Sequence, residues 1–150
     1  MSESADALMA RNRAILCHFD SYSTALLFAR WGTTMLWPEA LPAGTSPMAA
    51  PDAIAPIYDG EAVRQHVAAT LGLNEKEIIH MDDYQQWVQA EDGPIRIQLL
   101  RFTTFEAPKA QIDALGAVFK PISELRGSAM SELVLLREVF NLIVAGGGRA

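Results

Sequence analysis

The sequence predicts an α+β fold in which a mixed β-sheet is flanked by helices. Several short apolar or alternating segments are typical of strands, and one segment near the middle has apolar residues at helical spacing. The most apolar helical segment lies near the end of the chain. The chain has 150 residues, of which 50% are hydrophobic and 20% charged, so we expect a single domain spanning 1–150.

The first third of the chain predicts a hairpin. Residues 2–12 are expected to form a short helix or a loose tail. The apolar runs "RAILCHF" (13–19) and "TALLFAR" (24–30) are typical of strands. Between them "DSYS" (20–23) favours a turn, because Asp and Ser side chains bond nearby backbone amides. Residues 13–30 are therefore predicted to form two antiparallel strands.

A proline-rich segment follows, from Trp37 to Tyr58, and its prolines are Pro38, Pro42, Pro47, Pro51 and Pro56. Proline lacks an amide donor and restricts the residue before it, so we expect neither a helix nor a central strand here. Long loops of this kind are usually binding loops, lids or disordered segments. Residues 38–58 are predicted to be a loop within the single domain.

Asp59 precedes a predicted helix over 60–71, where apolar residues recur at helical spacing and Gly72 supplies a stop. Three further strands are expected at 77–81, 84–90 and 94–105. The last two form a second predicted hairpin around the turn "EDG" (91–93).

The C-terminal third predicts short elements and then a long helix. The short elements are a helical turn in 107–116, a strand at 117–120 and a turn of helix in 121–127. The segment "LVLLREVFNLIV" (133–144) is apolar nearly all round, and such a helix must be covered on every side. We expect Ser131 to cap the start of this helix and the negative charge of Glu132 to interact favourably with its positive N-terminal end. The run "GGG" (146–148) is expected to end it. Leu136 and Phe140 are predicted core positions, where truncation to alanine costs about 2–5 kcal/mol.

The composition of the chain excludes or disfavours several classes of function. The net charge of −6 disfavours binding to nucleic-acid polymers and to anionic membranes. The apolar stretches are far shorter than the roughly 20 residues that span a bilayer, and "MSESADALMARN" lacks an apolar signal core. Cys17 is the one cysteine, which excludes an internal disulfide and a cysteine-based zinc site. We therefore expect a cytoplasmic protein.

Six segments occur in an informative order. They are "ALLFARWG" (25–32), "LWPEALPAG" (36–44), "AVRQHVAATLGL" (62–73), "IRIQLLRF" (95–102), "VFKPISELRG" (118–127) and "ELVLLREVF" (132–140). This order resembles the Nudix fold, in which a strand pair and a "W-x-x-P-G-G"-like loop precede the catalytic helix. A strand hairpin, a "W-x-p-h-x-E-L" segment and a C-terminal helix follow it. The resemblance implies an α/β/α sandwich.

The chain departs from the family pattern where that family does its chemistry. The Nudix helix reads R-E-hydrophobic-x-E-E-x-G-hydrophobic, and alignment on Gly72–Leu73 places Gln65–His66 at its Arg-Glu pair and Ala69–Thr70 at its two glutamates. Those glutamates hold divalent metals, for which alanine and threonine cannot substitute. Glu61 stands about 12 Å along the helix from Ala69, at 1.5 Å per residue. The resemblance therefore implies a member without the usual hydrolase activity and without a cofactor.

Five residues around the loop and the helix are candidates for ligand contact: Trp37, Glu39, Glu61, Arg64 and His66. Trp37 can stack on a base or line a cleft, and core packing is the alternative. His66 can act as a base or a metal ligand, whereas a single histidine on a short helix is more often a packing residue. Arg64 can bind an anion or serve surface solubility.

The acids around the helix start allow a second interpretation. Glu39, Asp59, Glu61 and His66 could together rebuild a magnesium site from loop carboxylates. The alternative is that these acids are solvated or act on the helix start, where acids are common. Arg96 and Arg101 lie in one predicted strand, five positions apart, so their side chains are expected on opposite faces. At most one of them can therefore point into a given pocket.

Three hypotheses follow. The first is a non-catalytic Nudix-like domain that binds a nucleotide-like ligand or a protein. The second is a metal-dependent hydrolase of diphosphate-linked nucleotides with the rearranged site. The third is an unrelated α+β interaction protein that forms a homodimer, because the apolar helix over 133–144 needs covering on all sides.

Overall fold

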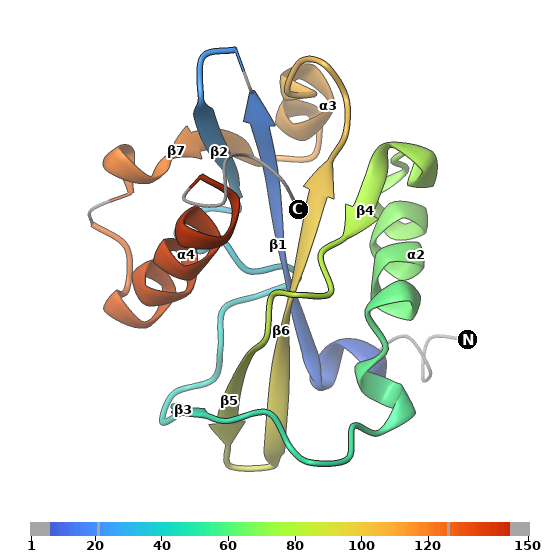
Figure 1. Cartoon of the computed structure of the whole chain (residues 1–150), viewed down its shortest axis with the longest axis vertical. Coiled ribbons are helices and arrows are strands. Elements are labelled where there is room, and N and C mark those ends of the chain that lie inside the picture. The colour runs from blue at the N-terminus through green and yellow to red at the C-terminus, as the bar shows by residue number, and fades with distance from the viewer. Residues whose placement is uncertain (1–6, 21, 126, 145–150) are drawn as a thin grey trace.

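The computed structural model describes residues 7–20, 22–125 and 127–144. Within these residues a seven-stranded mixed sheet has the order β3-β5-β6-β1-β2-β7, with β4 paired to β6 (Figure 1). The strands are β1 (Asn12–Asp20), β2 (Ala25–Arg30), β3 (Ser46–Met48), β4 (Ile78–His80), β5 (Gln86–Ala90), β6 (Gly93–Phe102) and β7 (Val118–Pro121). The α-helices are α2 (Gly60–Leu71), α3 (Lys109–Ala114) and α4 (Met130–Ile143), and residues 7–10 are also helical. The predicted α+β class and mixed sheet are confirmed.

Strand β1 lies at the centre of the sheet and separates two cores. It pairs antiparallel with β2 and parallel with β6. Because strand side chains alternate between faces, Ile15 and Cys17 join the core beneath α4, whereas Ala14 and Leu16 join the core beneath α2. Figure 1 shows α4 and α2 on opposite sides of the central strands. The fold is therefore a three-layer α/β/α sandwich.

Helix α2 begins and ends as the sequence predicts. The Oδ1 atom of Asp59 accepts a hydrogen bond from the Glu61 backbone N–H at 3.3 Å. Gly72 ends the helix with a left-handed φ of 68°, which glycine adopts without steric cost. Val63 and Val67 are fully buried against the sheet. Gly60 is tightly packed, since a Cβ built on it would lie 2.0 Å from His80 ring atoms.

A buried polar network lies beneath the start of α2. The Gln98 side-chain amide donates to Asn12 Oδ1 and to the Tyr58 carbonyl, each at 2.9 Å. The His80 ring Nε2 lies 2.8 Å from Gln98 Oε1, which accepts its hydrogen bond. Arg96 donates to the same Tyr58 carbonyl at 3.0 Å and lies over the Trp87 ring. The network pairs the Gln98, Asn12 and His80 side chains and fixes the segment that precedes α2, although two guanidinium nitrogens of Arg96 make no hydrogen bond.

The start of α4 differs from the prediction. The helix begins at Met130, its N-cap is Ala129, and no side chain caps it, so the predicted Ser131 cap is wrong. Glu132 is 5% exposed and accepts hydrogen bonds from Thr34 Oγ1 at 2.5 Å and from the Met35 backbone N–H at 2.8 Å. The Glu132 carboxylate therefore links α4 to the loop that contains Thr34 and Met35. The sequence predicted only a favourable charge at the start of the helix. The predicted stop at 146–148 lies outside the described residues.

Helix α4 is buried along one side only. Its fully buried side chains are Leu136, Val139 and Ile143. Phe140 is 39% exposed, so its prediction as a core residue is wrong. At about 3.6 residues per turn, Phe140 lies at the margin of the stripe formed by Leu136, Val139 and Ile143. Leu136 stays a core position.

The proline-rich segment is more structured than predicted. It contains β3, which pairs with β5 at the edge of the sheet, and a short 3-10 helix, Pro56–Tyr58. Proline is tolerated in an edge strand, where an amide donor is not required on the outer side. Trp37 exchanges two backbone hydrogen bonds with Ala14, each 2.9 Å long.

The other elements confirm most of the remaining expectations. Both predicted hairpins form, although β6 ends at Phe102 rather than at 105. Arg96 and Arg101 lie on opposite faces of β6, as predicted. Arg96 is only 4% exposed, so it does not serve as a solubilising surface charge. Burial lowers the pKa of Arg96, and the charge of Asp82 partly offsets that shift.

The Cys17 thiol is expected to be inert in the folded protein. Its side chain is fully buried, and desolvation raises its pKa to about 12, so the reactive thiolate is scarce at neutral pH. A thiol-specific reagent at pH 8 should label no cysteine in native protein and one in protein unfolded by urea. Rapid labelling without denaturant would show that the core between β1 and α4 opens easily.

Candidate functional site

The candidate site lies where the two parallel strands end. β1 and β6 run side by side in the same direction, so their carboxyl ends meet at one edge, at the top of Figure 1. The β1–β2 turn and the segment 103–108 follow these strand ends. In sheets with parallel strands, ligands commonly bind just beyond the carboxyl ends, because the departing loops leave space there.

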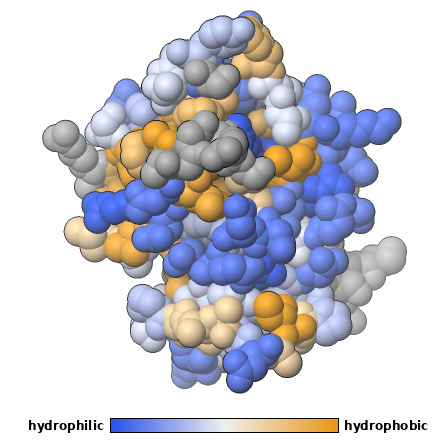
Figure 2. Space-filling view, in the orientation of Figure 1, coloured by the Kyte–Doolittle hydropathy of each residue, from blue (hydrophilic) through white to orange (hydrophobic). Residues whose placement is uncertain are grey.

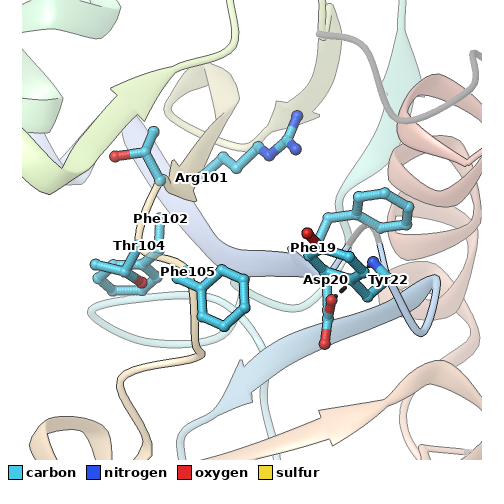
Figure 3. Close-up of a pocket in the computed structure, with 8 residues that line it drawn as sticks. Phe19, Asp20, Tyr22, Arg101, Phe102, Thr104 and Phe105 are labelled. Carbon is cyan, nitrogen blue, oxygen red and sulfur yellow. Dashed lines mark hydrogen bonds between the residues drawn. The ribbon is translucent and has the colours of Figure 1, made fainter.

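A pocket of about 230 Å³ opens at this edge. Its wall from β1 and the following turn contains Phe19, Asp20 and Tyr22. The opposite wall comes from β6 and its loop, and consists of Arg101, Phe102, Thr103, Thr104 and Phe105. Figure 3 shows the two groups facing one another across the hollow. We call these eight residues the edge pocket.

Aromatic rings form much of the edge pocket. Tyr22 and Phe105 are in edge-to-face contact, with ring centroids 5.8 Å apart, although their side chains are 83% and 74% exposed. The Arg101 guanidinium lies 5.7 Å from the centre of the Phe19 ring, which is a cation–π arrangement. Rings this exposed offer flat apolar surface to a partner, and the guanidinium adds a positive charge beside them.

Asp20 supplies a fixed negative charge to the edge pocket. Its Oδ1 accepts a hydrogen bond from the Tyr22 backbone N–H at 2.9 Å and a longer one from the Ser23 N–H at 3.4 Å. The Tyr22 amide is the main cause that lowers the pKa of Asp20, so the carboxylate is ionised at neutral pH. The sequence predicted this turn chemistry, and the structure confirms it.

A second hollow of about 340 Å³ lies on the other side of Asp20. It is lined by His18, Asp20, Ser23, Ala25, Leu27, Glu106, Ala107 and Lys109. The His18 ring donates from Nε2 to the Thr104 carbonyl at 2.8 Å, which ties β1 to the loop that carries Phe105. The volume of this second hollow lies within the range of about 300–1,000 Å³ that is usual for small-ligand sites, and the edge pocket is smaller.

The structure brings two of the predicted ligand-binding residues together. The Trp37 and His66 rings are 5.9 Å apart between centroids, and both side chains are partly buried. Trp37 packs on the core beneath α2, which agrees with the core-packing alternative. Neither residue lines the edge pocket.

The charged candidates lie in separate ion pairs. Arg64 binds both carboxylate oxygens of Glu61 on the outer side of α2, and this pairing lowers the Glu61 pKa. Arg64 also donates to the carbonyls of Glu75 and Ile78, so it fixes the chain that follows the helix. Glu39 pairs instead with Arg13 at 3.6 Å.

These pairings bear on the rearranged metal site. Asp59 caps α2, Glu61 pairs with Arg64, and Glu39 pairs with Arg13. Across residues 7–20, 22–125 and 127–144, no three His, Cys, Asp or Glu side chains gather in a way that could hold a metal ion. The described residues therefore do not assemble the rearranged site.

Sequence reasoning missed the edge pocket. Arg101 was a candidate only as one of several arginines, and Asp20 only as a turn residue. Phe19, Tyr22 and Phe105 carry no motif. Two signals could have pointed to them: large aromatic residues stand beside polar turns, and both turns directly follow apolar strands.

The edge pocket offers few groups of the kind that acid–base catalysis uses. Its ionisable side chains are Asp20, Tyr22 and Arg101. A catalytic carboxyl needs a pKa near the working pH, whereas the pKa of Asp20 is shifted downward. The threonine hydroxyls have no histidine within this lining to activate them.

Comparisons with known proteins leave the family undetermined. The sequence matches no protein-family model, and no curated protein matches it either.

In the part of the chain that the structure describes, no helix has the length and apolar character needed to cross a membrane.

Proposed function

We propose that this protein is a non-catalytic binding domain that holds a small nucleotide-like ligand in the edge pocket. The observation that supports this most is the arrangement at the carboxyl ends of two parallel strands, where Arg101 lies beside the Phe19 ring and the Tyr22 and Phe105 rings contact one another. A base has a flat face that stacks on aromatic rings, and a phosphate matches a guanidinium. The net charge of −6 favours such a small ligand over a nucleic-acid polymer.

We further propose that the domain is a Nudix-type fold that has lost its hydrolytic site. The three layers, the helix that ends at Gly72 and the C-terminal helix support this relationship. Ala69 and Thr70 are exposed on α2, where the family pattern has its metal-binding glutamates. Cytoplasmic location belongs to the same proposal, and cell fractionation tests it.

The binding role predicts saturable heat release on titration with a mononucleotide such as AMP. Phe105→Ala and Arg101→Gln should each weaken binding about tenfold or more, because one removes stacking surface and the other a charge-assisted bond. Phe140→Ala removes an exposed ring on α4, outside the pocket, and should leave affinity unchanged. Absence of binding across a nucleotide panel would exclude this function.

The same protein should release no phosphate or pyrophosphate from dinucleotides or nucleoside triphosphates with magnesium or manganese. Turnover that disappears in Glu61→Gln or His66→Ala would instead support the rearranged-site hydrolase. Both readouts use one preparation, so binding without turnover separates the two hypotheses.

A homodimer is the second proposal, and the outer face of α4 supports it. Met130 and Val134 point away from the core and are 69% and 44% exposed, with Phe140 at the margin. Figure 2 shows hydrophobic residues interleaved with hydrophilic ones on the α4 side of the molecule, while the α2 side is largely hydrophilic. Burying such a face against a second copy would cover the helix on the side that the sheet leaves open.

Light scattering at micromolar concentration should give twice the chain mass. Val134→Glu should yield monomers, because it places a charge in the apolar contact. Gln111→Glu, an exposed change on α3, should not. A monomeric mass for the unaltered protein would exclude the homodimer.

A further inference from the structure

We infer that Asp20 determines the class of ligand: it selects a ribonucleotide, whose neighbouring sugar hydroxyls donate to its carboxylate, over the 2′-deoxy form. This inference rests on the binding role proposed for the edge pocket, and it assigns the specificity of that site to one side chain.

The position of Asp20 is the first reason. It is the last residue of β1, and it lines both the edge pocket and the second hollow. A ligand that enters from either side therefore meets this carboxylate. The backbone N–H groups of Tyr22 and Ser23 hold Oδ1, so the side chain has a fixed direction.

The chemistry of a carboxylate is the second reason. An ionised carboxylate only accepts hydrogen bonds, so the part of the ligand that contacts it must donate. It also repels a phosphate placed at the same position. A pair of adjacent hydroxyls matches both requirements, as in dinucleotide-binding folds where an acidic residue binds the ribose.

The opposite charges of the pocket are the third reason. Asp20 stands on the wall from β1 and Arg101 on the wall from β6, and their charged groups point toward opposite faces of the sheet (Figure 3). A ligand that lies across the strand ends, with hydroxyl donors toward one face and an anionic group toward the other, is oriented by these two charges. The rings of Tyr22 and Phe105 at the rim then offer a stacking surface to the base. A ribonucleoside monophosphate carries all three features.

The test compares AMP with 2′-deoxy-AMP by calorimetric titration. The unaltered protein should bind AMP about tenfold more tightly, a difference of about 1.4 kcal/mol. Asp20→Asn keeps an oxygen that can accept from the Tyr22 amide but removes the charge, and it should abolish most of this preference. Asp113→Asn, an exposed change on α3, is the matched control and should keep it. The melting temperature of each variant verifies that it is folded.

The outcomes separate this inference from the proposed function. Equal affinity of the unaltered protein for the two nucleotides would overturn the inference and leave the binding role standing. Failure of both nucleotides to bind would overturn the binding role itself. A preference that survives in folded Asp20→Asn would show that another group reads the sugar. If that variant does not fold, 2′-O-methyl-AMP replaces it, because the unaltered protein should bind this analogue as weakly as the deoxy form.

Discussion

Leu136→Ala should lower the free energy of unfolding by about 2–5 kcal/mol, the range for truncating a large core side chain. Leu136 is fully buried in the core between α4 and the sheet, which also contains Phe28 and Leu99. Removing three carbon atoms loses apolar burial and leaves a cavity that packed neighbours cannot fill. Urea denaturation followed by circular dichroism measures the change.

Phe140→Ala is the matched comparison on the same helix. Its side chain is 39% exposed, so its truncation should cost clearly less than that of Leu136. Equal losses would mean that the outer margin of α4 is covered, as a homodimer would require. Two variants that unfold like the parent would show that α4 contributes little to the core, contrary to this architecture.

Among the glycines that the structure describes, Gly60→Ala should be the most damaging alanine substitution, and it should lower the free energy of unfolding by about 1–3 kcal/mol or more through overpacking. Its new Cβ would lie 2.0 Å from both Cε1 and Nε2 of His80. The ring cannot withdraw without giving up its hydrogen bond to Gln98, and that bond belongs to the network beneath α2. Thermal and urea unfolding give the size of the effect.

His80→Ala provides the diagnostic partner for Gly60→Ala. If the clash causes the loss, the double variant should lose less stability than the sum of the two single variants, because the ring is gone. Gly127→Ala is the control, since a Cβ at that position meets no atom within 4 Å. Additive losses for Gly60 and His80 would place the cause in the backbone of α2 instead.

Local rules predicted much of the fold. Apolar runs located β1 and β2, and alternation placed Arg96 and Arg101 on opposite faces of β6. Asp59 and Gly72 marked the ends of α2, because capping depends on a few adjacent atoms. The role of Glu132 in α4 could not be predicted, because its carboxylate binds Thr34 and Met35, which are remote in the sequence.

The edge pocket could not be predicted for the same reason. It forms because β1 lies parallel to β6, and neither strand carries a signal for that pairing. Phe19 and Arg101 come together only through this register, so their cation–π contact is invisible along the chain. The predicted candidates came from the proline-rich loop and from α2, and the structure distributes their charges among separate partners.

The central position of β1 also sets an order of events during synthesis. Gln98 of β6, which binds Asn12 of β1, lies 86 positions after it in the sequence. Glu132 of α4, whose carboxylate binds Thr34, lies 98 positions after Thr34. A ribosome therefore releases the first hairpin long before β6, which pairs with β1, and α4, which covers one of its faces, exist. Such long-range closure is slow and leaves apolar surface open to wrong contacts. We therefore expect the nascent hairpin to be a stage at which Ile15 and Leu16, both buried in the finished fold, are open to wrong contacts.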